Sequence, residues 1–226
     1  ITCEELQNVL NEMAAPTTPG KKPLKFSSLE LVKSLYSGMY KYALGAHIVT
    51  ADTQASVSIP IKDDDQNGIP FSLEELDILY KHLDDYVVQS VVIMCYSGWR
   101  IREFLTMKTD LNNMTFFGGV KTKAGKRRTV PIHTDLTALV TEYLKHPFTC
   151  TPDSYRKKWD EVLDNLGILY TGIVADNGAP IKHTPHDCRH TFSWICDKYK
   201  VDPISKRLMI GHKLGEDVTD NVYGHR

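Results

Sequence analysis

The sequence is poor in the features that mark secreted, membrane-bound or zinc-binding proteins. Its 226 residues include five cysteines, an odd number with no C-x-x-C pair, which argues against a disulfide framework and against structural zinc. The chain begins without a basic and then apolar leader, and no apolar run approaches the roughly 20 residues that cross a bilayer. These absences predict a protein of the reducing cytoplasm that is not attached to a membrane.

Cofactor signatures are missing as well. The sequence contains no G-x-x-x-x-G-K-[ST] loop, so no nucleotide cofactor is expected. It also contains no cluster of carboxylates of the sort that holds catalytic magnesium. We therefore expect neither a cofactor nor a bound metal.

The chain has no overall excess of positive charge, since its formal net charge is -1. This value gives no general sign of nucleic-acid binding. The charges are nevertheless segregated along the chain. Negative charge gathers at Asp63, Asp64 and Asp65, whereas one later segment carries only positive charges, at Lys121, Lys123, Lys126, Arg127 and Arg128.

The sequence of the first sixty residues predicts two helices. Two helices bury too little apolar surface to form an independent core. Thr2 can cap the first helix, and Ser27 or Ser28 can cap the second. On the second helix, one face would carry Leu31, Leu35, Met39 and Tyr42. A polar stretch with turn residues follows, so we place a linker at residues 61–70 and a new folding unit at residues 71–226.

The second unit predicts a mainly α fold with a small antiparallel β-sheet. Its first helix has a clear start, since Ser72 and Glu75 can form a capping box. Gly98 permits a tight turn after an apolar helix. Residues 115–132 alternate as short strands, with a hairpin turn at residues 124–126, and helices resume from Ser154 to the end.

The segment HTPHDCRHTF, residues 183–192, is the most informative part of the sequence. Thr184 can act as N-cap with Pro185 in the first turn, which places His186 and Arg189 on one face near a helix N-terminus. Such a terminus favours a bound phosphate. The alternative is an amphipathic helix whose His and Arg are merely solvated. His190, beside the apolar face, is interpreted as a structural histidine.

Two other segments carry candidate cations. In SGWRIREFL, Glu103 lies one turn after Arg100 and could orient its guanidinium, although a surface ion pair is the common alternative. Arg102 would point to a different side of this helix from Arg100, and it is interpreted as a solvated residue. In KTKAGKRRTVPI, Lys123 precedes the hairpin turn and could reach a phosphate, although lysines there could equally be a solvated strand edge.

The end of the chain supplies two further candidates. In IGHK, Gly211 can end a helix and leave His212 at its exposed tip. Tyr223 follows in a short final helix, where a tyrosine is usually a packing residue. Taken alone, each candidate residue has an ordinary structural explanation. Finding all of them in this order along one chain is far less easily explained by chance.

This order resembles the tyrosine recombinase or phage integrase family, from about Phe71 to the C-terminus. The matching segments are SGWRIRE, KTKAGKRRTVPI, HDCRHTF, IGH and NVYGH. The resemblance implies a helical catalytic domain at residues 71–226 that breaks and rejoins DNA strands through a 3′-phosphotyrosine. It also implies that residues 1–60 are the last part of a helical core-binding domain.

The resemblance assigns the catalytic set Arg100, Lys123, His186, Arg189, His212 and Tyr223. Tyr223 would be the nucleophile and His186 its proton acceptor, while Lys123 would protonate the leaving oxygen. The two arginines and His212 would neutralise the phosphate, with Glu103 as support. Lys121, Lys126, Arg127 and Arg128 would contact the DNA backbone.

The implied partner is double-stranded DNA at attachment sites or element ends of a bacterial prophage or transposon. A homotetramer on DNA is implied for the full-length protein, with accessory directionality or DNA-bending proteins, whereas a chain that stops at Arg226 could be monomeric. Two alternatives stay open. One is a type IB topoisomerase, which would relax DNA without exchanging partners, and the other is a DNA-binding module without catalytic activity.

Overall fold

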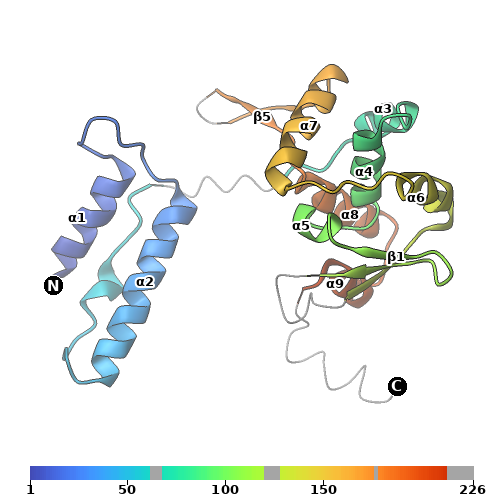
Figure 1. Ribbon diagram of the computed structural model, residues 1–226. Helices are drawn as coiled ribbons and strands as arrows, with labels where there is room; N and C mark the ends of the chain where they lie inside the picture. Colours follow the sequence, from blue (N-terminus) through green and yellow to red (C-terminus); the bar gives the residue numbers. More distant parts are fainter. Residues whose placement is uncertain (62–67, 120–127, 176–177, 213–226) are drawn as a thin grey trace, which may run out of the picture. The chain divides into compact units, whose positions relative to one another are not determined.

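The computed structural model describes residues 1–61, 68–119, 128–175 and 178–212 (Figure 1). The chain forms two compact units, Ile1–Asn67 and Gly68–Arg226. They are called here the N-terminal and the C-terminal unit, and each is described by itself. Among the described residues, no helix has the length and apolar character that crossing a membrane requires.

The N-terminal unit consists of two helices and a short 3-10 turn. Helix α1 spans Cys3–Ala14, α2 spans Phe26–Gly45 and η1 spans Thr53–Ser56. The cap predicted at Thr2 is confirmed, because its side chain and that of Glu5 form a reciprocal capping box. Its small apolar core contains Leu6, Leu10, Leu29 and Val57.

The cap predicted for α2 is wrong. This helix begins at Phe26, after Lys25 in an extended conformation, so the two serines at 27 and 28 lie inside its first turn. The predicted apolar face lies on the outside of the unit and is not covered by its described residues. Its side chains remain exposed at Leu31, Leu35, Met39 and Tyr42.

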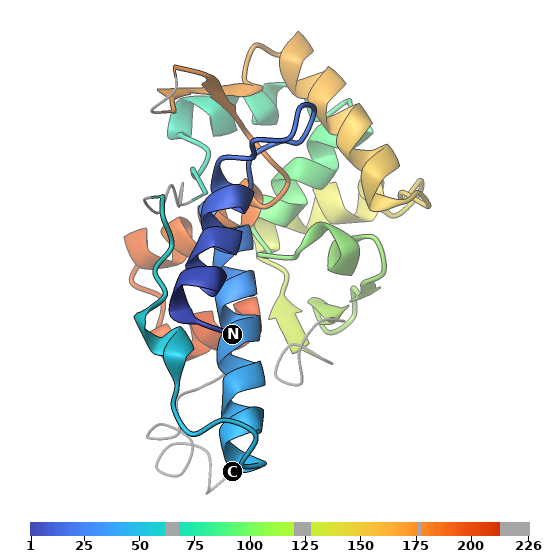
Figure 2. The same ribbon diagram turned by 90° about the vertical axis from the view of Figure 1, so that its left-hand side faces the viewer.

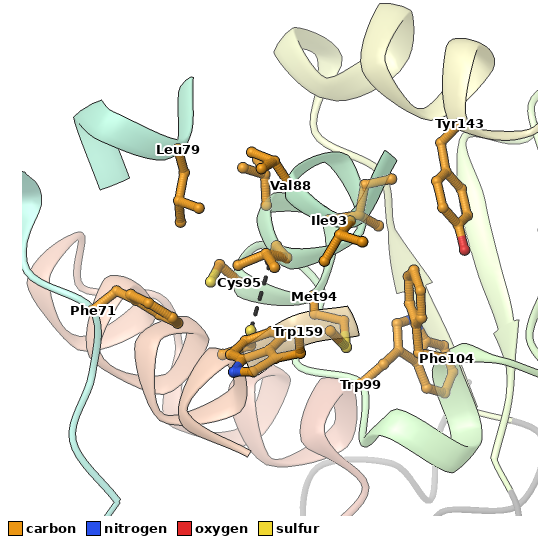
Figure 3. Close-up of a cluster of buried hydrophobic side chains, with 14 of the residues drawn as sticks. Phe71, Leu79, Val88, Ile93, Met94, Cys95, Trp99, Phe104, Tyr143 and Trp159 are labelled. Atoms are coloured by element: carbon orange, nitrogen blue, oxygen red, sulfur yellow. Dashed lines mark hydrogen bonds between the residues drawn. The ribbon is translucent and has the colours of Figure 1, made fainter. Parts of the chain in front are cut away.

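The C-terminal unit is built around one apolar helix, α4, at Tyr86–Cys95, which is buried from Val87 to its end. Asp85 caps α4 by accepting hydrogen bonds from two backbone amides. Figure 3 shows α4 side chains such as Val88, Ile93 and Met94 among aromatic rings from other segments. The helices around α4 are α3 at Leu73–Lys81, α6 at Thr137–Tyr143, α7 at Pro152–Asn165 and α8 at Asp187–Lys198.

Helix α3 begins where the sequence predicts. Ser72 and Glu75 form the expected capping box, and Phe71 just before it is buried in the core. Phe71 also donates its backbone amide to the Thr191 hydroxyl on α8, at 2.9 Å. The start of the unit is therefore tied to the helix that carries the H-x-x-R segment.

A three-stranded antiparallel sheet lies beside the helices in the order β1-β2-β3. Its strands are Lys108–Asp110, Thr115–Gly118 and Arg128–Pro131, with Phe116 opposite Val130. The predicted pairing of β2 with β3 is confirmed, while the turn between them lies outside the described residues. Figure 2 shows the same elements turned by 90°.

A second hairpin was not predicted. Strands β4, Tyr170–Val174, and β5, Pro180–Lys182, pair as a separate two-stranded sheet. Their side chains are mostly exposed, so they lack the alternation of apolar and polar residues from which strands are inferred. The sequence predicted only helices in this part of the chain, from Ser154 to the end.

The remaining described helices of the C-terminal unit are short. These elements are α5 at Ile101–Phe104, η2 at Thr134–Leu136 and α9 at Pro203–Ile210. The glycine predictions at the ends of α4 and α9 are confirmed. Gly98 has φ +65°, and a Cβ there would lie 2.6 Å from the Phe192 ring, while Gly211 ends α9 in the left-handed conformation.

A buried histidine joins α3 to α8. His183 has a fully buried side chain, with Nδ1 3.3 Å from an Asp187 oxygen and Nε2 3.2 Å from a Glu75 oxygen. Its ring stacks on Phe71 with 4.1 Å between centroids. Burial opposes the imidazolium, but the hydrogen bonds and charges of Asp187 and Glu75 outweigh it and raise the pKa of His183 to about 8.

The raised pKa of His183 predicts a loss of stability at alkaline pH. Because the folded pKa lies above the unfolded value near 6.5, the contribution is complete below about pH 6.5 and disappears as pH rises through about 8. We expect about 2 kcal/mol from this group. Denaturant unfolding at pH 6 and pH 9 should show this loss in wild type but not in His183→Gln. The exposed histidine variant His133→Gln is the control, and equal pH dependence of His183→Gln and wild type would contradict the assignment.

Candidate active site

Arg100 lies directly before α5 and is held there by a carboxylate. Its guanidinium Nη1 is 3.4 Å from Glu103 Oε1, and its backbone amide donates to Glu103 Oε2 at 3.3 Å. The Arg100 side chain is 23% exposed, whereas that of Glu103 is only 2% exposed. Glu103 therefore anchors one side of the guanidinium from inside the protein, and the other side can reach a ligand. The expected support by Glu103 thus has a direct geometric basis.

Arg189 reaches the same place from α8. Its Nη1 donates to the Gly98 carbonyl at 2.8 Å, and its Nη2 donates to the Ile210 carbonyl. Two of its five N–H groups are used in this way, so others are left for a ligand. Burial, with the charges of Arg100 and Arg128, lowers the pKa of Arg189 to about 9, and it stays cationic at neutral pH.

The start of α8 differs in detail from the prediction. The helix begins at Asp187 with His186 in the cap position, and no side chain caps it. Thr184 does not act as N-cap. Instead, its backbone amide donates to the Asp187 carboxylate at 2.7 Å, because Asp187 folds back over the preceding turn. His186 is therefore placed by this turn, which lies just outside the helix.

His186 is exposed at the surface and lies beside His190, with 5.0 Å between their ring centroids. Partial burial removes water from the imidazolium and lowers the pKa of His186. Electrostatic repulsion by His190, Arg189 and Arg100 lowers it further. A neutral imidazole at physiological pH can accept a proton. This is the protonation state that a general base requires.

His212 follows the end of α9 and is exposed, as the sequence predicts. Its backbone amide donates to the Arg207 carbonyl at 2.9 Å, which fixes the residue next to Gly211. Partial burial lowers the pKa of His212, and so do the charges of Arg189 and Arg100, with smaller effects of Arg207 and Arg128. Four candidates from three segments are thus close enough to influence one another, namely Arg100, His186 with Arg189, and His212.

Arg128 does not lie where a DNA-contacting residue would. Its side chain is 2% exposed and is 3.0 Å from Glu103 Oε2. The expectation of a backbone phosphate contact at this position is therefore corrected. Arg128 is the first residue of β3, and its side chain extends into the core of the unit and not toward the solvent. The rest of the basic segment, Lys121, Lys123, Lys126 and Arg127, lies outside the described residues, as does Tyr223.

The exposed part of the site is a pocket between α5, α7 and the turn before α8. Its lining includes Arg100 and His186, together with two arginines that sequence reasoning missed, Arg102 and Arg156. Arg102 was expected to face elsewhere, but the short α5 turns it toward this pocket. Arg156 comes from a helix far away in the sequence, where its pairing with Asp153 gave no functional signal.

Comparisons with known proteins identify the fold. No family model matches the chain, and no curated protein matches its sequence. Among solved structures, the Tn1549 transposon integrase bound to transposon right end DNA is similar at TM-score 0.72 and 15% identity, over 100% of this chain and 82% of that one. A lambda integrase dimer bound to a core site gives TM-score 0.65 and 15% identity, over 95% and 80%. XerA recombinase gives 0.52 and 19%, over 95% and 76%.

These likenesses confirm the predicted fold class. The C-terminal unit is mainly helical with small antiparallel sheets, and it has the catalytic fold of the tyrosine recombinases. The fold alone does not assign an activity, because one fold can support several functions. The residues gathered in the site have to carry that argument.

Proposed function

We propose that this chain breaks and rejoins DNA strands through a covalent 3′-phosphotyrosine, as a site-specific recombinase of a mobile element. The observation that carries the proposal is the convergence of Arg100, His186, Arg189 and His212 on one place in a tyrosine recombinase fold. They come from three segments, and Arg189 links the other two by donating to the backbone carbonyls of Gly98, near Arg100, and Ile210, near His212.

The proposed first step is attack of the Tyr223 oxygen on a DNA phosphorus. The bond from phosphorus to the 5′ oxygen breaks, and a phosphotyrosine bond to the 3′ phosphate replaces it. The tyrosine proton passes to His186, whose lowered pKa keeps it neutral and able to accept. Lys123 gives a proton to the departing 5′ oxygen. Attack by a 5′ hydroxyl reverses the step and rejoins the strand.

The arginines would stabilise the charge on the phosphate as it reacts. Arg100 and Arg189 present planar guanidinium groups whose orientations are set by Glu103 and by backbone carbonyls. Such preset donors need little reorganisation when the transition state forms. His212, whose pKa is lowered by partial burial and then by its cationic neighbours, can donate one further hydrogen bond. The expected set of roles is therefore compatible with the charges of the site.

Duplex DNA at the ends of an integrating element is the proposed substrate. The similar structures of the Tn1549 integrase and lambda integrase hold transposon end DNA and a core site, respectively, which supports this choice. Assembly of several copies on the DNA, with accessory proteins that set direction, belongs to the same proposal. Sedimentation with and without DNA would reveal the number of copies.

Arg156 is expected to contact a DNA phosphate beside the reacting one. It lines the same pocket as Arg100, and each phosphate that a cationic side chain neutralises adds to the salt-dependent part of DNA affinity. We expect Arg156→Gln to weaken binding by about threefold and to reduce the slope of log K against log salt by about 0.9. Fluorescence anisotropy with a duplex of random sequence, measured over a range of salt concentrations, would test this.

The matched control for this prediction is Lys145→Gln. Lys145 forms the same kind of exposed ion pair, with Glu142 three residues earlier, but it is not part of the pocket lining. Its loss should leave both the affinity and the salt slope unchanged. Equal effects of the two substitutions would show that Arg156 contributes only to overall charge.

Covalent capture tests the proposed function without knowledge of the target site. The protein is mixed with nicked duplexes of randomised sequence, in which a short fragment diffuses away after cleavage and traps the covalent complex. Protein recovered under denaturing conditions should carry DNA of an enriched sequence. Binding without any adduct would favour a non-catalytic module. Adducts that relax supercoils but never join two duplexes would favour a topoisomerase.

A further inference from the structure

We propose that Arg128 is a positioning residue, which holds Arg100 and His212 in place from beneath the site. This inference rests on the proposed function, because it assigns a further residue to the same site. Arg128 was first grouped with the basic segment that follows Val120, and its surroundings separate it from that group. It contacts the segments that carry two site residues, while its own side chain is closed to solvent.

The first observation is how Arg128 is held in the core. Its guanidinium carbon lies 3.9 Å from the centroid of the Trp99 ring, and Trp99 is itself fully buried. A guanidinium stacked on an indole face gains a cation–π attraction that is stronger when water is excluded. Burial lowers the pKa of Arg128 to about 10, with Glu103 opposing that change, so the group remains charged at neutral pH. A buried charge of this kind requires a partner.

The second observation concerns two backbone carbonyls. Arg128 donates from Nη1 to the Ile210 carbonyl at 2.7 Å and from Nη2 to the Gly98 carbonyl at 3.4 Å. Arg189 donates to the same two oxygens. Gly98 lies two residues before Arg100, and Ile210 lies two residues before His212. The two guanidinium groups therefore link the turn before α5 to the end of α9.

The third observation is the division of Glu103 between two arginines. Its Oε1 faces Arg100, while its Oε2 lies 3.0 Å from Arg128 Nη2 and accepts the Arg100 backbone amide. Without Arg128, the carboxylate would keep Arg100 as its only cationic partner among the described residues. The Arg100 guanidinium would then be drawn inward to compensate a buried charge, away from the phosphate it is proposed to bind.

Lysine could not replace Arg128 in this arrangement. The guanidinium serves a carboxylate, two carbonyls and an aromatic face at once, which requires a planar group with donors in fixed directions. An ammonium group would keep the charge but could not reach all of these partners. A residue that only contacted a DNA phosphate would tolerate the change far better. The conservative variant therefore separates the two interpretations.

The test compares Arg128→Lys and Arg128→Met with wild type in single-turnover adduct formation on the nicked duplex pool. We expect the maximal rate to fall by about 30-fold or more in both variants, as for loss of a preset donor. The DNA concentration giving half the maximal rate should change by less than about threefold, and the salt slope should not change. A raised half-saturating concentration, with activity restored by lysine, would overturn the proposal in favour of a DNA contact.

A general loss of stability is excluded by two controls. Val140→Ala removes methyl groups from the same core, at a residue that takes no part in the hydrogen bonds of the site, and its adduct rate should follow only the folded fraction. If Arg128→Met does not fold, the double variant Arg128→Met with Glu103→Gln removes both charges and restores a balanced core. A rate in the folded double variant that falls below that of Glu103→Gln alone supports positioning by Arg128, whereas a rate equal to that of Glu103→Gln alone overturns it.

Hydrogen exchange provides a measurement that does not depend on activity. In Arg128→Met, peptides covering residues 98–104 and 208–212 should exchange faster, while those of α6 should not change. Unchanged exchange in both segments would overturn the positioning role, whatever the activity. If faster exchange is found in a protein whose wild type forms no adduct, the proposed catalysis fails while the structural link through Arg128 stands.

Discussion

Replacing Tyr223 by phenylalanine is expected to abolish the covalent protein–DNA adduct. The change removes a single oxygen, which the proposed mechanism uses as its nucleophile, and none of the described candidates Arg100, His186, Arg189 and His212 carries a phenol. We expect at least about a 10³-fold loss of adduct, in line with the removal of other enzymatic nucleophiles. DNA affinity should change by less than about twofold, because the arginines that contact phosphate remain. Denaturing gels with labelled nicked duplex would measure the adduct.

The matched control for this variant is Tyr199→Phe. Tyr199 lies at the C-terminal end of α8 and is largely exposed, so it offers an accessible phenol elsewhere in the same unit. Its replacement should leave the adduct at the wild-type level. An adduct that survives Tyr223→Phe would remove Tyr223 from the proposed mechanism.

Replacing Arg100 by lysine is the second large effect expected. The variant keeps the positive charge but loses the planar group that Glu103 holds from within the protein. Since preset donors to a developing charge contribute about 10² to 10³ in rate, we expect the cleavage rate to fall by that factor. Affinity for DNA should change little, because charge supplies most of it. Single-turnover kinetics at saturating DNA would separate rate from binding.

Arg102→Lys provides the comparison for Arg100→Lys. Arg102 lines the same pocket, but it is exposed and its side chain has no hydrogen bond to the described residues. A lysine there can replace it as a point charge, so the cleavage rate should stay within about twofold of wild type. Equal rates for Arg100→Lys and wild type would show that Arg100 does not hold the reacting phosphate.

Local signals in the sequence predicted the parts of the site that depend on local geometry. The capping box at Ser72 and the glycines at 98 and 211 each concern a few neighbouring residues, and the structure contains all three features. The two glycines place Arg100 and His212, because each allows a turn that other residues would disfavour. These predictions succeeded because backbone conformation limits the choices at such positions.

Features that depend on distant contacts were harder to predict. Arg128 carries the same charge as its neighbours in the sequence, and only the packing of β3 against Trp99 and the end of α9 buries it. Likewise, nothing in the sequence near Arg156 indicates that α7 brings it to the pocket. The hairpin of β4 and β5 is exposed and therefore lacks an apolar pattern. In each case, tertiary packing decides the outcome.

Identification of the residue that carries DNA is the most direct test of the proposed function. Captured adducts would be digested with nuclease and protease, and the peptide bearing a nucleotide would be sequenced by mass spectrometry. The proposed mechanism predicts a 3′-phosphonucleotide on Tyr223, the residue directly before Gly224. A nucleotide on any other residue, or the absence of a modified peptide from protein that binds DNA, would contradict it.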